Sequence, residues 1–120
     1  MQNIDLICVG KLNAKYFAEG VAEYHKRLAA FASFRIIELP EEKIEEKNAS
    51  DAVVKKALDK EGKAILSNVH KGAAVVAMCI EGKQISSDEL AQFLADRANS
   101  GAGDVAFVIG SSHGLSDEVK

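Results

Sequence analysis

The feature that most constrains the fold is an alternation of short apolar runs with longer amphipathic segments. The apolar runs are rich in β-branched residues and mostly continuous, which is typical of strands buried on both faces of a parallel sheet. They occupy residues 3–9, 34–39, 73–80 and 105–109. Because helical patterns separate them, the chain is predicted to be an α/β protein. We expect a Rossmann-like parallel sheet with three-layer α/β/α packing and right-handed crossovers.

The first amphipathic segment carries apolar residues at steps of four and three, the spacing of one helix face. These residues are Phe17, Val21, Tyr24, Leu28 and Phe31. We expect this face to pack on the sheet, with the charged face in solvent. The alternative is a phosphate-contacting patch formed by the basic residues of this region. They are Lys11, Lys15, His25, Lys26 and Arg27.

The second helix is predicted over residues 51–68, with Ser50 as its N-cap. Its apolar stripe contains Val54, Ala57, Leu58, Glu61, Ile65 and Val69. Glu61 is either a partly buried carboxylate with satisfied hydrogen bonds or a residue at the edge of the stripe. The third helix is predicted to begin at Ser86, because Ser86 and Glu89 have the spacing of a capping box.

The sequence Gly-Ser-Ser-His-Gly at residues 110–114 directly follows the last apolar run, and Ser116 then resembles a helix start. A strand, a glycine turn and a helix start mark the place where an open α/β sheet binds its ligand. The alternative is a tight βα turn without a ligand. The spacing is not the dinucleotide fingerprint and lacks a Walker lysine, so triphosphate hydrolysis has no support. His113, in this turn, is either a surface residue or a ligand contact.

Two predicted strand ends, residues 78–82 and 110–115, open into glycine turns. In a parallel sheet both ends lie on the same rim, where backbone N–H and C=O groups can bind an adenine or a carboxylate. The residues alone therefore predict a small-ligand α/β domain.

Composition narrows the function classes. The 120 residues fit one domain, 1–120, with 48% hydrophobic residues and a net charge of −3. No run has transmembrane length and no leader is apparent, which predicts a cytoplasmic protein without a membrane partner. Residues 1–40 contain five Lys and Arg against four Asp and Glu, which permits nucleic-acid binding without arguing for it. Cys8 and Cys79 lie in apolar runs and are predicted to be buried thiols; zinc-ligand spacing is absent, so no metal is expected.

The sequence resembles the SPOUT-class methyltransferases of the RlmH family. Seven segments match in order, at residues 9–11, 23–28, 37–40, 60–66, 80–83, 86–91 and 108–115. No single segment is specific, but together they make the match strong. The resemblance departs at Ser111, where the family usually has glycine, and at Cys79, where it usually has an acidic residue.

The resemblance implies a SPOUT fold with an alpha/beta knot and methylation of N3 of a pseudouridine in 23S ribosomal RNA. It implies S-adenosylmethionine as cofactor, bound around Met78, Gly110, Ser111 and Leu115, and a homodimer that acts on ribosomal RNA in the assembled ribosome. Family members continue beyond the equivalent of Lys120 with the knot, a third cofactor loop and the RNA-serving residues. We therefore expect a C-terminally incomplete domain with unknown catalytic residues, which binds the cofactor weakly or not at all and can be inactive by itself.

Under this reading the strand at 105–109 is expected to border either an open sheet edge or an uncovered apolar face, through which the chain self-associates. The alternative function is a non-enzymatic α/β module for a small ligand or for protein interaction.

Overall fold

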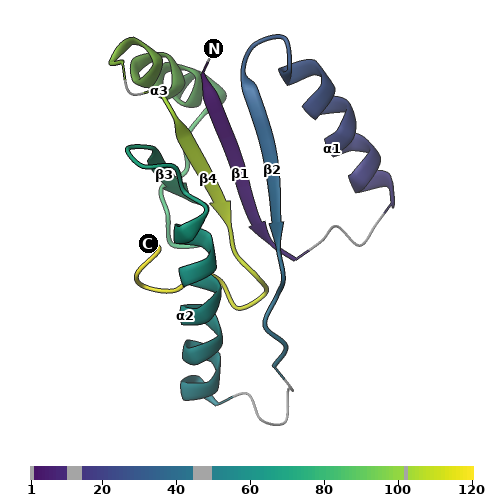
Figure 1. The fold of residues 1–120 in the computed structure, drawn as a ribbon, viewed down its shortest axis with the longest axis vertical. Helices are drawn as coiled ribbons and strands as arrows, with labels where there is room; N and C mark the ends of the chain where they lie inside the picture. Colours follow the sequence, from purple (N-terminus) through teal and green to yellow (C-terminus); the bar gives the residue numbers. More distant parts are fainter. Residues whose placement is uncertain (1, 11–14, 45–49, 102) are drawn as a thin grey trace.

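The computed structural model describes residues 2–10, 15–44, 50–101 and 103–120. Strands and helices alternate along them, which confirms the predicted α/β class (Figure 1). In chain order they are β1 (Asn3–Val9), α1 (Lys15–Leu28), β2 (Ser33–Leu39), α2 (Asp51–Ser67), β3 (Ala74–Ala77), α3 (Ser87–Asn99) and β4 (Val105–Ile109).

The four strands form one sheet in the order β2-β1-β4-β3, and every pairing is parallel. β4 therefore lies inside the sheet, between β1 and β3. The expectation that β4 borders an open edge is wrong, because the chain returns from β3 through α3 into the centre of the sheet. Its Val105 and Val108 are fully buried, and β2 and β3 form the two edges.

The sheet register assigns side chains to two faces. Leu6, Ile36 and Phe107 are in register and share one face, and Ile7, Ile37 and Val108 share the other. α2 covers the second face and buries Ile65 there. The core cluster comprises Ile7, Val9, Ile65, Ala106, Val108, Leu115 and Val119.

The opposite face carries α1 and α3. Residues of α1 line a pocket with Leu6 and Ile36, and Leu90 of α3 lines another with Phe107. The crossovers β1–α1–β2 and β3–α3–β4 run in the same direction across the sheet, so right-handed connections place both helices on one side. The three layers are therefore α2, the sheet, and α1 with α3.

The apolar stripe of α1 does not pack as expected. No residue of α1 is buried, and Phe17 and Tyr24 are 55% and 65% exposed. His25 explains the orientation of the helix, because its Nε2 lies 3.0 Å from the backbone oxygen of Phe34 and its ring meets the Phe34 ring edge-on. A hollow of about 640 Å³ remains between α1 and the sheet.

The predicted helix boundaries hold well. Ser50 accepts a hydrogen bond from the Val53 N–H at 3.3 Å, and Ser86 forms the full capping box with Glu89. Strand β3 is shorter than predicted: it ends at Ala77, and Ile80 beyond it is fully exposed.

None of the described helices is long and apolar enough to cross a membrane.

The segment after the glycine turn forms a single turn rather than the predicted helix. The N–H groups of Val119 and Lys120 both donate to the Ser116 carbonyl. Val119 and Leu115 are buried against α2, so the segment closes the core at this end of the sheet.

Candidate functional site

The glycine turn after β4 is held in a narrow backbone geometry. A Cβ on Gly110 would collide with the carbonyl of Gly114 and with the Leu115 side chain, so only glycine fits there. The Gly114 N–H donates to the Ser111 carbonyl at 2.9 Å, and Gly114 has a φ of +92°, which favours glycine. The turn is therefore compact, with its backbone close to the end of β4.

Met78 lies beside this turn at the end of the neighbouring strand. Its N–H donates to the Val108 carbonyl at 2.9 Å, which places the end of β3 next to the end of β4. Its side chain is 58% exposed and lines a pocket of about 680 Å³ together with Ile80, Ile85 and Leu90. The predicted adjacency of the two strand ends is thus present, with exposed apolar side chains around it.

The four residues that the resemblance points to have different surroundings. Met78 and Gly110 are brought together at the rim. The Leu115 side chain is 6% exposed and belongs to the core cluster, so only its backbone can contact a ligand. The Ser111 hydroxyl donates to Glu61 Oε1 at 3.0 Å and is therefore drawn toward α2.

Glu61 lies at the rim. The sequence allowed two positions for it, a partly buried one with satisfied hydrogen bonds and one at the edge of the apolar stripe. It is 6% exposed, and besides Ser111 it accepts the backbone N–H of Glu42 at 2.8 Å. It is therefore a buried carboxylate with satisfied hydrogen bonds. Its partners lie 50 and 19 residues away in the chain, so no local pattern could have identified them.

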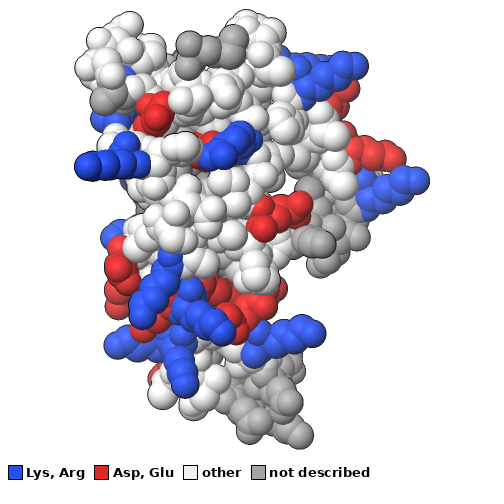
Figure 2. Space-filling view, viewed as in Figure 1, with Lys and Arg blue, Asp and Glu red and all other residues white. Residues whose placement is uncertain are grey.

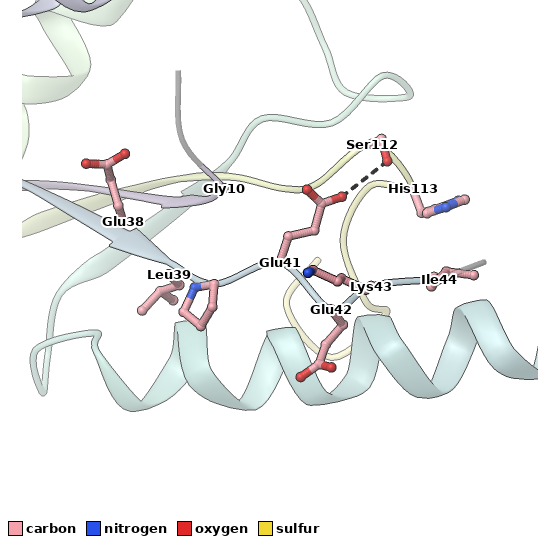
Figure 3. Close-up of a pocket in the computed structure, with 10 residues that line it drawn as sticks. Gly10, Glu38, Leu39, Glu41, Glu42, Lys43, Ile44, Ser112 and His113 are labelled. Atoms are coloured by element: carbon pink, nitrogen blue, oxygen red, sulfur yellow. Dashed lines mark hydrogen bonds between the residues drawn. The ribbon is translucent and has the colours of Figure 1, made fainter. Parts of the chain in front are cut away.

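The other side of the glycine turn borders a second pocket, of about 870 Å³ (Figure 3). It lies between Gly10, residues 38–44 at the end of β2 and just beyond it, and Ser112 with His113. Figure 3 shows Glu41 reaching Ser112, whose hydroxyl donates to it at 3.4 Å, while Glu42 points toward α2. Glu42 pairs with Lys60 of that helix at 3.1 Å. His113 thus lines a rim pocket, in agreement with its place in the turn.

A charged pair lies just beyond β3. The Lys120 ammonium contacts the Glu81 carboxylate at 2.6 Å. This hydrogen bond lowers the pKa of Glu81 and raises the pKa of Lys120. Both groups are therefore charged over the whole neutral range, and they tie the end of the described chain to the turn that follows β3.

A second buried carboxylate lies away from the rim. Asp5 of β1 binds Arg35 of β2 through two hydrogen bonds of 2.9 and 2.8 Å, and His70 approaches it to 3.3 Å. The hydrogen bonds that Arg35 donates to the Asp5 carboxylate raise the pKa of Arg35. The sequence analysis missed this cluster, although an aspartate and an arginine in two apolar runs were a visible signal. Through His70, this cluster holds the segment that follows α2 against the sheet.

The basic group considered for phosphate binding is partly neutralised. Arg27 pairs with Glu23 at 3.0 Å and Lys15 with Glu19 at 4.0 Å, while Lys11 lies outside the described residues. Figure 2 shows acidic and basic side chains intermingled over α2, on the lower part of the visible face.

In the part of the chain that the structure describes, no group of three or more His, Cys, Asp or Glu could hold a metal ion.

The whole chain matches known proteins. A family model described as "Predicted SPOUT methyltransferase" matches residues 2–120. The chain is 47% identical over 117 residues to ribosomal RNA large subunit methyltransferase H of Streptococcus uberis, 48% identical to that of Ligilactobacillus salivarius and 50% identical to that of Bacillus thuringiensis. Each alignment covers 98% of this chain and 73% of the relative.

The match of the family model covers residues 2–120, a range that contains every described strand and both glycine turns at the carboxyl rim of the sheet. With the parallel α/β fold, it shows that the chain belongs to the SPOUT methyltransferases, as a member of the ribosomal RNA large subunit methyltransferase H family.

Proposed function

We propose that this chain acts in the methylation of N3 of a pseudouridine in large-subunit ribosomal RNA, with S-adenosylmethionine as methyl donor. The observation that carries the proposal is the 47–50% identity, along almost the entire chain, to proteins named ribosomal RNA large subunit methyltransferase H. The substrate would be met in the assembled ribosome, in the cytoplasm, by a homodimer.

The described residues at the rim suit such a donor. Exposed apolar side chains at the end of β3, among them Met78, Ile80 and Ile85, offer a surface for an adenine ring. The compact turn beginning at Gly110 follows β4, whose Val108 carbonyl accepts the Met78 N–H at 2.9 Å, so its backbone lies beside the end of β3. We infer that Met78 and Gly110 contact the donor directly, that Ser111 shapes the turn, and that Leu115 contributes through its backbone.

When bound, the donor supplies an electrophilic methyl group on a sulfonium. The N3 electron pair would form the new bond to the methyl carbon, the sulfur would keep the electron pair of the broken carbon–sulfur bond as a neutral thioether, and the N3 proton would pass to water. The protein's contribution is to hold the two reactants in line, and orientation of this kind accounts for a large share of rate enhancement. We infer that the rim residues hold the donor, and that the base approaches over the pocket that His113 lines.

Two measurements test the proposal. Titration calorimetry with S-adenosylmethionine should give binding that Met78→Asp abolishes, because a carboxylate replaces the apolar surface. Lys26→Glu, on the exposed side of α1, should bind as the parent does. Radiolabelled methyl transfer to large ribosomal subunits that lack the modification should localise to one pseudouridine. Labelling at a different base, or binding unaffected by Met78→Asp, would contradict the proposal.

A further inference from the structure

The carboxylate of Glu61 occupies a position where an apolar side chain is expected. It lies one helical turn before Ile65, which is fully buried, and it belongs to the same stripe of α2. Burial of a carboxylate costs free energy unless hydrogen bonds replace its water, and a hydrophobic residue in such a place is often at least as stabilising. The presence of Glu61 is therefore explained by what its oxygens bind.

The two oxygens of Glu61 bind two separate parts of the rim. Oε2 accepts the backbone N–H of Glu42, in the segment after β2, at 2.8 Å. Oε1 accepts the hydroxyl of Ser111, in the glycine turn after β4, at 3.0 Å. β2 and β4 are not neighbours, since β1 lies between them. Glu61 thus connects two rim segments that strand pairing does not bring together.

The next residue of α2 fixes the other end of the same turn. A Cβ on Gly62 would collide with the hydroxyl of Ser116 and lie 3.2 Å from Val119. The helix backbone therefore packs directly on the segment that follows the glycine turn. With Ser111 bonded to Glu61 and Ser116 packed on Gly62, the turn is held by α2 on both sides.

We propose that Glu61 is a positioning residue for the methyl-donor site. It fixes the glycine turn relative to helix α2 and to the segment after β2, so that the Gly110 backbone is already placed when the donor arrives. The inference rests on the proposed function in one respect, the identity of the ligand. Its structural part, the fixing of two rim segments by one carboxylate, is testable without any ligand.

The test uses four single variants of the purified chain and the double variant Glu61→Ala, Ser111→Ala. Glu61→Ala removes both acceptors. Glu61→Gln keeps one oxygen for the Glu42 N–H and offers its amide as a donor to the Ser111 hydroxyl, which can also accept. Ser111→Ala removes one of the two links. Asp59→Ala, two residues away on the same helix and partly exposed, is the matched control for loss of a carboxylate.

Amide hydrogen exchange is the ligand-free readout. Glu61→Ala should speed exchange about tenfold in residues 41–44 and 110–114, and leave β1 unchanged. Glu61→Gln should restore slow exchange, and Asp59→Ala should match the parent. Equal exchange in Glu61→Ala and the parent would overturn the proposal. So would a failure of Glu61→Gln to rescue, because charge rather than geometry would then be responsible.

Calorimetry with S-adenosylmethionine is the second readout. Glu61→Ala should weaken the donor about tenfold, which is 1.4 kcal/mol, and Glu61→Gln should stay within about threefold of the parent. Because Ser111 acts through Glu61, adding Ser111→Ala to the Glu61→Ala variant should cause no further loss of donor affinity. Unchanged donor affinity beside faster exchange would overturn the link to the donor site.

The two proposals fail in different ways. A parent chain that binds no donor contradicts the proposed function, while the exchange data still decide the role of Glu61. If Glu61→Ala does not fold, Ser111→Ala and Glu61→Gln carry the test. Ser111→Ala should then speed exchange in residues 110–114 alone, and slow exchange there would contradict the proposal.

Discussion

At the scale of single residues, a side chain beside a binding site can serve stability or binding, and burial separates the two roles. Met78 and Leu115 were both predicted as cofactor residues from the resemblance. The structure exposes one and packs the other into the core. The sequence could not distinguish them, because both follow apolar strands and both are large and hydrophobic.

We expect Leu115→Ala to lower the free energy of unfolding by about 2–5 kcal/mol, the usual effect of truncating a buried leucine. Met78→Ala should change it by no more than about 1 kcal/mol, because the Met78 side chain is largely in solvent. Urea denaturation monitored by circular dichroism measures both values. Similar losses for the two variants would show that Met78 is part of the core.

Cys8 provides a second residue-scale prediction. Its thiol is half-buried and lies 3.6 Å from the Ile37 carbonyl. Burial, with the neighbouring charge of Glu38, raises the pKa of Cys8. The reactive thiolate is therefore scarcer at neutral pH than in an ordinary cysteine. Alkylation of Cys8 by iodoacetamide should be slow at pH 7.5 and should rise only at more alkaline pH than for free cysteine.

Peptide mass mapping distinguishes the two cysteines, and a Cys8→Ser variant identifies the slow phase. If Cys8 reacts as fast as free cysteine at pH 7.5, the thiol is not in the environment described here.

At the scale of the elements, the sequence located three of the four strands, α2 and the start of α3 to within one residue, and it failed at the end of β3 and at the helix expected from Ser116. The stripe and Ser50 cap of α2 are both present, and α3 begins at the capping box. β3 was predicted too long because its apolar run continues into Met78 and Ile80, whose exposure depends on the turn beyond. Apolar character alone does not show where pairing stops.

The contact between α2 and the segment after the glycine turn leads to an element-scale prediction. Replacing a helix glycine by alanine normally stabilises by about 1 kcal/mol. In Gly62→Ala the new methyl would overlap Ser116, and overpacking costs about 1–3 kcal/mol. We therefore expect a net loss of stability of about 1 kcal/mol.

Gly20→Ala in α1 is the matched control, because nothing lies within 4 Å of its added methyl. This variant should gain about 0.5–1 kcal/mol in the free energy of unfolding. Thermal or urea unfolding would show the two substitutions with opposite signs. A gain in both would mean that α2 does not pack closely on Ser116.

At the scale of the whole molecule, alternation predicted a parallel sheet with helices on both sides, and both are present. The strand order could not be predicted. The residues at 105–109 indicate a buried strand, but their pattern does not show that this strand lies between β1 and β3. The same limit applies to the site. The adjacency of two strand ends followed from the parallel sheet, whereas the Glu61 links depend on how α2 sits on it.

The exposed stripe of α1 suggests how two chains would meet. Large apolar side chains gathered on a surface usually mark an interaction site, and Phe17 and Tyr24 are more than half exposed. We expect the parent chain to associate, and a Phe17→Glu, Tyr24→Glu variant to be monomeric. A Lys26→Glu variant adds acidic charge to the same helix and should associate normally.

Light scattering behind a sizing column measures these masses over a range of concentrations. A monomeric parent, or an associated double variant, would exclude α1 as the contact surface.

The central place of β1 and β4 has a consequence for synthesis of the protein. Ile4 pairs with Val105, so one side of the first strand has no partner until about a hundred more residues have been translated. At roughly 5–20 residues per second this interval lasts on the order of 5–20 s. During that time β1 can pair in parallel with β2. The backbone N–H and C=O groups on the other side of β1 stay unpaired, and they can bind a strand of another protein. The pairing of the first strand on both sides is therefore a late event, which becomes possible only after residues 105–109 have been made.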